Sequence, residues 1–582
     1  MLEYKITGLK SAVTYQIRLK AVEKTTESES EYSDVKEVTT LVKAGFPMVA
    51  NNADEFIAIL SNADGLRSAS ATDEIQIKAN LDFTGKTLPA GPIFPGALVG
   101  NGNTISGITS DHAIFASVGS VSDLTIDESC TFAATKAGFL AALAAESTGT
   151  FTNVVNKANV SVVIAGAGDA TVAVGGLVAV GESKMDGCKN YGNVTYTAGA
   201  SYGALVGGLA GYNDGAMNKC ENHGNVTMSV ESLSAYGVVK SIDNLPIHIG
   251  GLAAQLGANA PVTESVNRGT VDYDITKVEN LAVSCGTNRP RMGGIVGLTQ
   301  SSITSSTNEG IVDVNVVTSD RSIFSGKNYP INVGGISGGA PVDASGASGA
   351  DITSCTNSGA ITCVTYCKGT IPTCGGIVAH PGYEDATQTN TITRCENTGS
   401  ISATTFTIAR VGGISGGSGS VTYCKNTGTI DGHLSIEDGN IGGIIGWLDK
   451  GHKFEYNESY CTLSNTRAPG TRGTSEVGGL IGQHGNYDSC PGEGRGCKVR
   501  CDISYDYSNE KWYGMLLGYF WSTHTVVLGT EDEPIIVLGG SMTYSGGTTQ
   551  ITAENYTKYT NHSSAGGNSG SKPFTVHVKF GE

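Results

Sequence analysis

Cysteine offers the most obvious reactive chemistry in this sequence, with 14 cysteines among 582 residues. Five of them recur two residues before an asparagine, and Ser265 and Ser306 take that place in two further units. The five are Cys188, Cys220, Cys355, Cys395 and Cys424. A metal site needs several converging ligands at short spacing, whereas this pattern supplies one thiol per unit. We therefore interpret the five as small packed residues of a structural column.

Two further cysteine groups are closer in sequence. They are Cys363, Cys367 and Cys374, and then Cys490, Cys497 and Cys501 within SCPGEGRGCKVRC. Spacing leaves open whether either group forms a disulfide, because bridge geometry cannot be read from it. Zinc is not expected, since neither group has a CxxC pair and neither His380 nor His484 has a standard ligand spacing. We predict no metal and no cofactor.

Carboxylates could act as an acid and base pair or hold calcium, as they do in polysaccharide lyases and polygalacturonase-like hydrolases. The sequence has no ordered run resembling N-x-D, D-D, G-H-G and R-x-K. Asp272, Asp274 and Asp313 fall near one another in repeat register, and we interpret them as solvated residues in or beside variable loops. No catalytic residue is assigned, and we expect no enzymatic activity; a carbohydrate-active enzyme is the alternative.

Aromatic side chains are the remaining candidates, because their rings bind sugars or seal apolar ends. Trp447 follows Gly446 at a predicted strand end, and Tyr383 lies in the insertion HPGYEDATQTN; both are candidate ligand contacts. Trp512 and Trp521 stand among Tyr513, Tyr519 and Phe520. We interpret that cluster as the seal between the last repeat and a cap.

A repeat positions all of these residues. The pattern is [VI]-G-G-[IL]-x-G, then C-x-N-x-G-x-[VI], and its units are 30 to 43 residues apart. The double-glycine position falls at Gly138, Gly175, Gly207, Gly250, Gly293, Gly334, Gly375, Gly412, Gly442, Gly478 and Gly514. Fixed motifs separated by variable intervals are typical of a solenoid.

Each unit offers three short β-type segments and no two-residue hairpin turn, so its strands must pair with those of neighbouring units, in parallel. The sequence predicts an all-β fold, a right-handed, three-sided parallel β-helix of about eleven coils. The double glycine would form a bend that turns both flanking apolar residues inward. The glycine of Asn-x-Gly would take positive φ at a corner. The asparagines would stack as an amide ladder: Asn190, Asn222, Asn267, Asn308, Asn357, Asn397 and Asn426.

The two ends differ from the repeats. Leu9, Tyr15 and the alternating Ile17, Leu19 and Ala21 resemble the late strands of a fibronectin type III domain, although Ser11 stands where that family usually has proline. We assign 1–43 to the C-terminal part of such a domain, 44–92 to an N-terminal cap with a short helix, 93–524 to the β-helix, and 525–582 to a C-terminal cap. The helix would bury Phe56, Ile57 and Leu60.

Variable stretches concentrate at two corners, and function on repeat scaffolds usually sits on loops. The longest are 227–249, 272–292 and 313–333, in three consecutive units, which would form one raised patch. The insertions 338–351 and 380–390 would enlarge a second corner.

The GG[IL]xG and CxNxG units resemble the GLUG-type repeats of bacterial surface proteins over about 380 residues. Together with the fibronectin-like start and the cap, the order resembles large exported proteins of gut Bacteroidetes. That resemblance implies an adhesin-like architecture and a cell-surface or extracellular location, and we expect an export signal upstream of Met1.

The predicted function is a monomeric surface scaffold that binds a glycan or a partner protein through loops on one edge; a structural spacer is another alternative. The net charge of −17 disfavours nucleic acid and anionic lipid as partners. No apolar run is long enough for membrane insertion.

Overall fold

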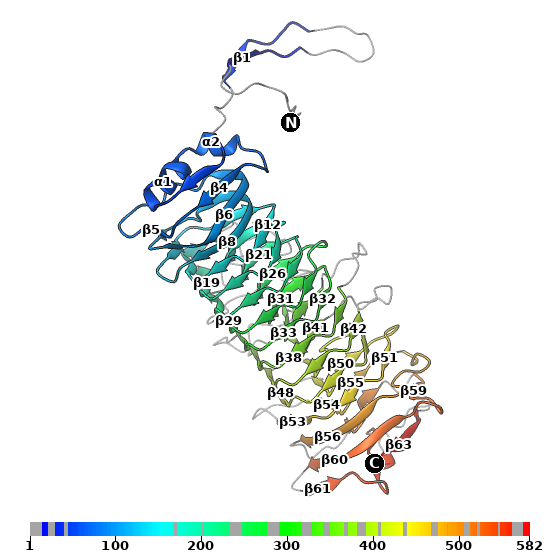
Figure 1. Cartoon of the computed structure of the whole chain (residues 1–582). Coiled ribbons are helices and arrows are strands. Elements are labelled where there is room, and N and C mark those ends of the chain that lie inside the picture. Colours follow the sequence, from blue (N-terminus) through cyan, green and yellow to red (C-terminus); the bar gives the residue numbers. More distant parts are fainter. Residues whose placement is uncertain are drawn as a thin grey trace.

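The computed structural model describes residues 14–20, 30–39, 45–167, 172–200, 203–232, 247–275, 290–316, 329–340, 350–365, 370–380, 391–405, 409–434, 439–466, 475–485, 487–505, 512–520, 524–544, 547–561 and 574–581. The strands stack in parallel into an elongated β-helix, which confirms the predicted fold class (Figure 1). No helix in these ranges is long and apolar enough to cross a membrane.

The N-terminal region begins with an antiparallel pair, β1 (Thr14–Ile17) and β2 (Lys36–Thr39), drawn apart from the stack in Figure 1. Strand β3 (Met48–Ala50) then pairs with β4 (Glu74–Ile77), so the cap already belongs to the parallel sheet. Between them lie α1 (Ala53–Ser61) and α2 (Ala63–Arg67).

Helix α1 covers the open end of the stack. The Asn52 side chain caps it by accepting a hydrogen bond from the Glu55 amide at 3.0 Å. Phe56 and Leu60 are buried, while Ile57 is only partly buried. The ring of Phe56 meets Phe83 edge-on, with centroids 6.3 Å apart.

The double-glycine strands form one eleven-stranded sheet, with one strand per coil. Its strands, in order, are β10 (Phe139–Ala141), β15 (Val172–Gly175), β20 (Ala204–Gly207), β25 (Ile247–Gly250), β30 (Arg291–Gly293), β35 (Tyr329–Gly334), β40 (Thr370–Gly375), β45 (Arg410–Gly412), β49 (Gly439–Gly442), β54 (Ser475–Gly478) and β57 (Tyr513–Gly514). The assignment of the first member to Gly138 was wrong. Ala141, not Gly138, pairs with Gly175, so alanines stand at the double-glycine position in that coil.

Each coil has more strands than the three segments predicted. The coil that starts at β20 continues through β21 (Ala210–Asn213), β22 (Met217–Asn218), β23 (Glu221–Asn222) and β24 (Val226–Ser232). All five pair in parallel with their counterparts in the next coil.

A left-handed residue separates β22 from β23. Lys219 has φ of 50°, and every coil from Asp123 to Gly496 has such a residue at this position. The column comprises Asp123, Asn153, Gly187, Lys219, Glu264, Ser305, Ser354, Arg394, Tyr423, Tyr456 and Gly496. Most members are not glycine, and a lysine, glutamate or tyrosine gives no sequence signal for positive φ. This column was therefore not predicted.

The double glycine makes the predicted bend. Val206 and Leu209, on either side of it, are both fully buried. A Cβ at Gly207 would lie 2.0 Å from the Ala210 carbonyl oxygen, and one at Gly208 would lie 2.0 Å from the Gly251 oxygen. The backbone turns too tightly here for any side chain.

The glycine of Asn-x-Gly has a different role from the one predicted. Gly224 does not have positive φ; instead a Cβ there would lie 1.9 Å from the carbonyl oxygen of Gly192 in the preceding coil. The same close approach recurs at Gly269, where a Cβ would lie 1.9 Å from the carbonyl oxygen of Gly224. This glycine is needed because neighbouring coils touch through their backbones.

The asparagines stand one above another inside the coil, all with 0% exposure. Each Nδ2 donates to the Oδ1 of the next at 2.8 Å, from Asn190 to Asn426, and Asn156 adds an earlier rung that the sequence pattern missed. From Asn190 to Asn397, Nδ2 also donates to the carbonyl oxygen two residues on, as in Asn267 to Gly269 at 2.8 Å. The ladder stops at Ser459, which pairs with Asn426.

The cysteine column runs beside this ladder and is fully buried. Side chains of the column accept a backbone N–H from the preceding coil: Cys220 N–H donates to Ser265 Oγ at 3.0 Å, and Cys395 N–H to Cys424 Sγ at 3.4 Å. Asn457 and Cys497 continue the column. Thiol, hydroxyl and amide share the position because each is a small acceptor.

The C-terminal cap extends the stack. Strand β56 (Lys498–Tyr505) pairs in parallel with β60 (Ile535–Tyr544), which pairs with β63 (Val578–Phe580) and with the antiparallel β61 (Gly547–Gln550). The cap also contains a 3₁₀ turn, Tyr556–Tyr559. Rings join the last coils to the cap, with the Phe520 and Phe574 centroids 5.2 Å apart.

We predict that Asn308→Leu lowers the free energy of unfolding by about 3 kcal/mol, because it leaves the amide oxygen of Asn357 buried without its donor. Asn193→Ala is the matched control. Its Oδ1 also bridges two coils, accepting the Asn225 N–H at 3.0 Å, but the site is solvent-exposed, so the loss should stay below about 1 kcal/mol. Urea unfolding followed by circular dichroism measures both; equal losses would contradict the ladder's role.

We predict that Gly224→Ala costs at least about 3 kcal/mol, since its methyl group would force two coils apart. Gly547→Ala serves as the control, because a Cβ there has only one neighbour, the Tyr544 oxygen at 3.8 Å. Thermal melts of the two variants should differ clearly. A near-native melting temperature for Gly224→Ala would show that the coils do not touch as described.

Candidate ligand-binding cleft

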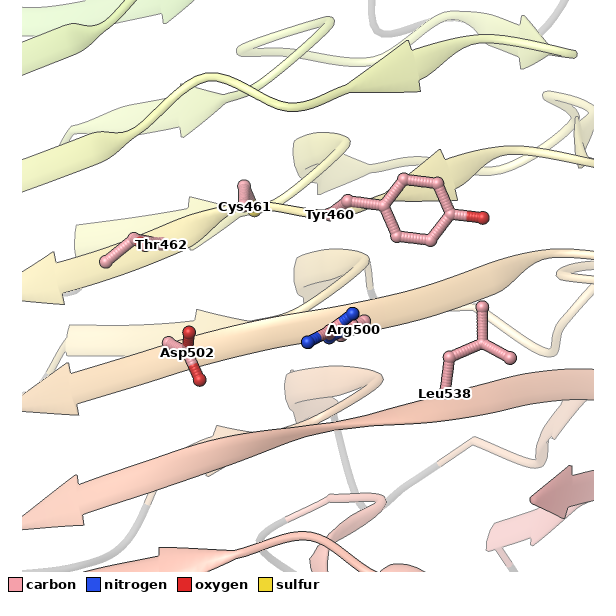
Figure 2. Close-up of a pocket in the computed structure, with 6 residues that line it drawn as sticks. All are labelled: Tyr460, Cys461, Thr462, Arg500, Asp502 and Leu538. Atoms are coloured by element: carbon pink, nitrogen blue, oxygen red, sulfur yellow. The ribbon is translucent and has the colours of Figure 1, made fainter. Parts of the chain in front are cut away.

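An open cleft of about 570 Å³ lies on the outer face of the solenoid near its C-terminal end (Figure 2). It is lined by Tyr460, Cys461, Thr462, Arg500, Asp502 and Leu538. Tyr460 and Cys461 connect β52 (Glu458–Ser459) to β53 (Thr462–Asn465), Arg500 and Asp502 lie on β56, and Leu538 lies on β60. Three successive layers therefore build the cleft.

A β-bulge creates the cleft. Val499 pairs with Val537, but Cys501 pairs with Gly540, so Leu538 and Gly539 together oppose Arg500. Gly539 and Gly540 have φ of 100° and 113°, and a Cβ at Gly540 would lie 2.2 Å from the Cys501 oxygen. The extra residue breaks the uniform outer face of the sheet.

The charged groups of the cleft are exposed to solvent. Arg500 and Asp502 project from alternate positions of the same strand, and Figure 2 shows both side chains in front of the sheet. Ser541 Oγ donates to Asp502 Oδ1 at 2.7 Å, which fixes the carboxylate and leaves its second oxygen available. Within the described ranges Arg500 has no ion pair, whereas neighbouring Lys498 is neutralised by Glu458 at 2.8 Å.

Tyr460 supplies a phenol that stays protonated. Burial, followed by the negative charge of Glu458 and a hydrogen bond to it, raises the pKa of Tyr460 to about 12. The phenol stays neutral at neutral pH, and because its one O–H is directed to Glu458, its oxygen is left to accept a hydrogen bond from a ligand.

A thiol pair lies beneath the cleft. Cys461 Sγ and Cys501 Sγ are 3.4 Å apart, and each is 3.3 Å from Ser459 Oγ, at the level where the asparagine ladder has ended. Both thiols are buried, and the hydrogen bond to Cys501, together with burial, raises the pKa of Cys461. This pair was not anticipated, because Cys501 had been grouped with Cys490 and Cys497.

The other cysteine groups are also free thiols. None of the twelve cysteines in the described ranges forms a disulfide, Cys363, Cys374 and Cys497 among them. Cys367 lies outside these ranges. Among the described residues no group of three or more potential ligands could hold a metal ion.

Trp447 lies on β50 (Ile445–Leu448) and is half-buried. The guanidinium carbon of Arg410 sits 3.2 Å from its ring centroid, so one ring face is already covered. Tyr383 and Trp521 lie outside the described residues. Trp512 packs edge-on against Tyr519 with centroids 4.3 Å apart, at the end of the stack.

Arg410 belongs to a buried polar column on the double-glycine sheet. Its members are His248, Arg291, Asn332, Thr373, Arg410, Asn440 and Glu476. All are at most 9% exposed. The third glycine of GG[IL]xG makes room for them, since a Cβ at Gly338 would lie 2.9 Å from Arg291 Cβ. Burial leaves this column unable to present a face to a large ligand.

The three aspartates noted in the sequence lie on strands, not in loops. Asp272 and Asp274 are on β29 (Val271–Ile275), and Asp313 on β34 (Val312–Val316) pairs directly with Asp272. Burial, followed by the charges of Asp313 and Asp274, raises the pKa of Asp272 to about 6. Burial and Asp274 also raise the pKa of Asp313. The solvated-loop interpretation was therefore wrong for these residues.

The loops expected to present a ligand surface fall largely outside the described residues. This applies to 233–246, 276–289 and 317–328 within the three long stretches, and to 341–349 and 381–390 within the insertions. The cleft residues were missed because they occupy ordinary outward strand positions. The only available signal was the glycine pair at 539–540, which interrupts an alternating strand.

No family model matches the chain, and no curated protein matches it. Among solved structures, one described as a "putative immunoglobulin A1 protease from Bacteroides ovatus" aligns with 50% of this chain and 81% of its own length. The sequence identity is 16% and the TM-score is 0.33.

We predict a pH-dependent effect of Asp272→Asn. The folded pKa of about 6 exceeds the unfolded value of about 3.9, so the stabilising contribution of the neutral carboxyl is present below pH 4 and is lost as pH rises through 6. At pH 7.5 the variant should be more stable than the parent by about 1 kcal/mol after allowance for solvent screening, and equally stable at pH 3.5.

Asp127→Asn provides a control of opposite sign. Hydrogen bonds from the Ser129 amide and hydroxyl lower the pKa of Asp127, so its stabilising contribution is present above pH 4 and is lost in acid. Denaturant unfolding at both pH values measures the two effects. If the stability difference between Asp272→Asn and the parent does not change with pH, burial and repulsion by Asp313 and Asp274 are not the cause of the raised pKa.

Proposed function

We propose that this chain is an extracellular or cell-surface scaffold that binds a glycan through the cleft at Tyr460, Arg500 and Asp502. The observation that carries the proposal is the convergence, on an exposed face, of a guanidinium, a phenol and a carboxylate around an open cleft of about 570 Å³. Carbohydrate hydroxyls need both donors and acceptors, and a sugar ring also packs on apolar carbon, which Leu538 and the Tyr460 ring supply.

The scaffold holds its surface residues in fixed positions, which favours a binding role. Five strand columns fix each coil on the next, so Arg500, Asp502 and Leu538 are held on paired strands, and Tyr460 lies in the two-residue link between β52 and β53. The net charge of −17 disfavours nucleic acid as the partner. The resemblance of the repeats to GLUG-type units supports a surface location, and the chain acts as a monomer in this proposal.

Hydrolysis of the glycan is less well supported than binding. An acid and base mechanism requires two carboxylates within about 10 Å, and the cleft lining contains one, Asp502. The paired aspartates, Asp272 and Asp313, lie five layers or more away along the axis, about 24 Å at the usual strand spacing. The described residues of the cleft lining therefore do not supply the two carboxylates of an acid and base pair.

A glycan array probed with the purified chain tests the proposal. We expect binding to at least one glycan class, and Arg500→Gln should weaken it by about tenfold or more, because a charge-assisted hydrogen bond is lost. Arg268→Gln is the matched control: Arg268 occupies the equivalent register position in an earlier coil, where it pairs with Glu221 at 2.8 Å and Glu309 at 3.2 Å. Its binding should equal that of the parent.

A silent array, or selective binding of a protein ligand unaffected by Arg500→Gln, would overturn the proposal. Release of shorter saccharides from a bound polysaccharide would replace it with an enzymatic function.

A further inference from the structure

We infer that the cleft selects a sugar acid, that is, a glycan residue carrying a carboxylate such as a uronic or other acidic sugar. This inference rests on the proposed glycan-binding function and narrows it to one chemical class. It follows because Arg500 in the cleft has no ion pair among the described residues, whereas the basic side chains beside it have one.

Arg500 carries the argument. The two basic side chains that precede it in the same segment are neutralised: Arg495 by Glu455 at 2.6 Å, and Lys498 by Glu458 at 2.8 Å. Arg500 is exposed and has no carboxylate within ion-pair distance among the described residues. A planar guanidinium binds a planar carboxylate through two parallel hydrogen bonds, which makes that group its preferred partner.

Asp502 restricts which anion can bind. It lies on the same strand two residues from Arg500, and Ser541 holds one of its oxygens. A free sulfate dianion has no hydroxyl to donate to Asp502, and Asp502 repels its second negative charge in a chain of net charge −17. A sugar acid supplies one negative charge for Arg500 and neutral hydroxyls that donate to the free oxygen of Asp502.

The remaining groups fit the rest of a sugar ring. The pKa of Tyr460 is raised to about 12, so the phenol stays neutral and adds no competing anion to the cleft. Tyr460 and Leu538 lie toward one side of Arg500, while Thr462 and Asp502 lie toward the other (Figure 2). The cleft thus has an apolar side and a hydroxyl-binding side, with the guanidinium between them.

Isothermal titration with a matched pair of probes tests this inference: an oligogalacturonide and the same oligosaccharide with its carboxylates methyl-esterified. We expect the acid to bind at least about tenfold more tightly than the ester, consistent with one charge-assisted contact. Arg500→Gln should abolish that preference, and Arg500→Lys should retain part of it, since lysine keeps the charge but not the fork. Arg268→Gln should leave both affinities unchanged.

A second variant separates the two sides of the cleft. Asp502→Ala should weaken the ester more than the acid, because both probes lose the hydroxyl contact while the acid also escapes repulsion between its carboxylate and Asp502. Circular dichroism of each variant verifies that the surface substitutions leave the fold intact.

The outcomes separate this inference from the proposed function. Equal affinity for acid and ester, unaffected by Arg500→Gln, overturns the sugar-acid inference and leaves glycan binding in place. Preference for a sulfated over a carboxylated oligosaccharide overturns it as well. Absence of binding to any glycan overturns both.

Discussion

Backbone pairing between successive coils is the constraint on which the rest of this molecule depends. The strands of one coil can satisfy their N–H and C=O groups only on the coils above and below, so equivalent residues must align in columns. Inside the coil this alignment lets asparagine, normally costly to bury, bond to its own copy at 2.8 Å from Asn156 to Asn426. Close coil contact, in turn, admits no side chain at Gly224 or its equivalents.

Repetition explains how far the sequence could predict this fold. When coils stack, an asparagine repeated at one position lies above its own copy in the next coil. The ladder from Asn190 to Asn426 was predicted from this alignment. The inward bend at the double glycine followed for the same reason. Steric reasoning from residue type was less secure: glycine after the ladder asparagine suggested positive φ, whereas it serves backbone contact, and positive φ falls on Lys219, Tyr423 and similar residues.

The register of degenerate units could not be read from local sequence. Gly138 looked like the start of a unit, but the strand pairing places Ala141 opposite Gly175. The aspartates show the same limit. Repeat register brought Asp272, Asp274 and Asp313 near one another, but only the strand bounds place them on a partly buried face, where mutual charge raises the pKa of Asp272.

The cleft shows why function was the hardest part to predict. A perfectly regular solenoid has uniform outer faces, and a uniform face offers no hollow. The hollow forms where regularity fails, at the bulge that places Leu538 and Gly539 opposite Arg500, one layer beyond the end of the asparagine ladder at Ser459. The capping strand β60 departs from the repeat, and that same departure supplies the cleft.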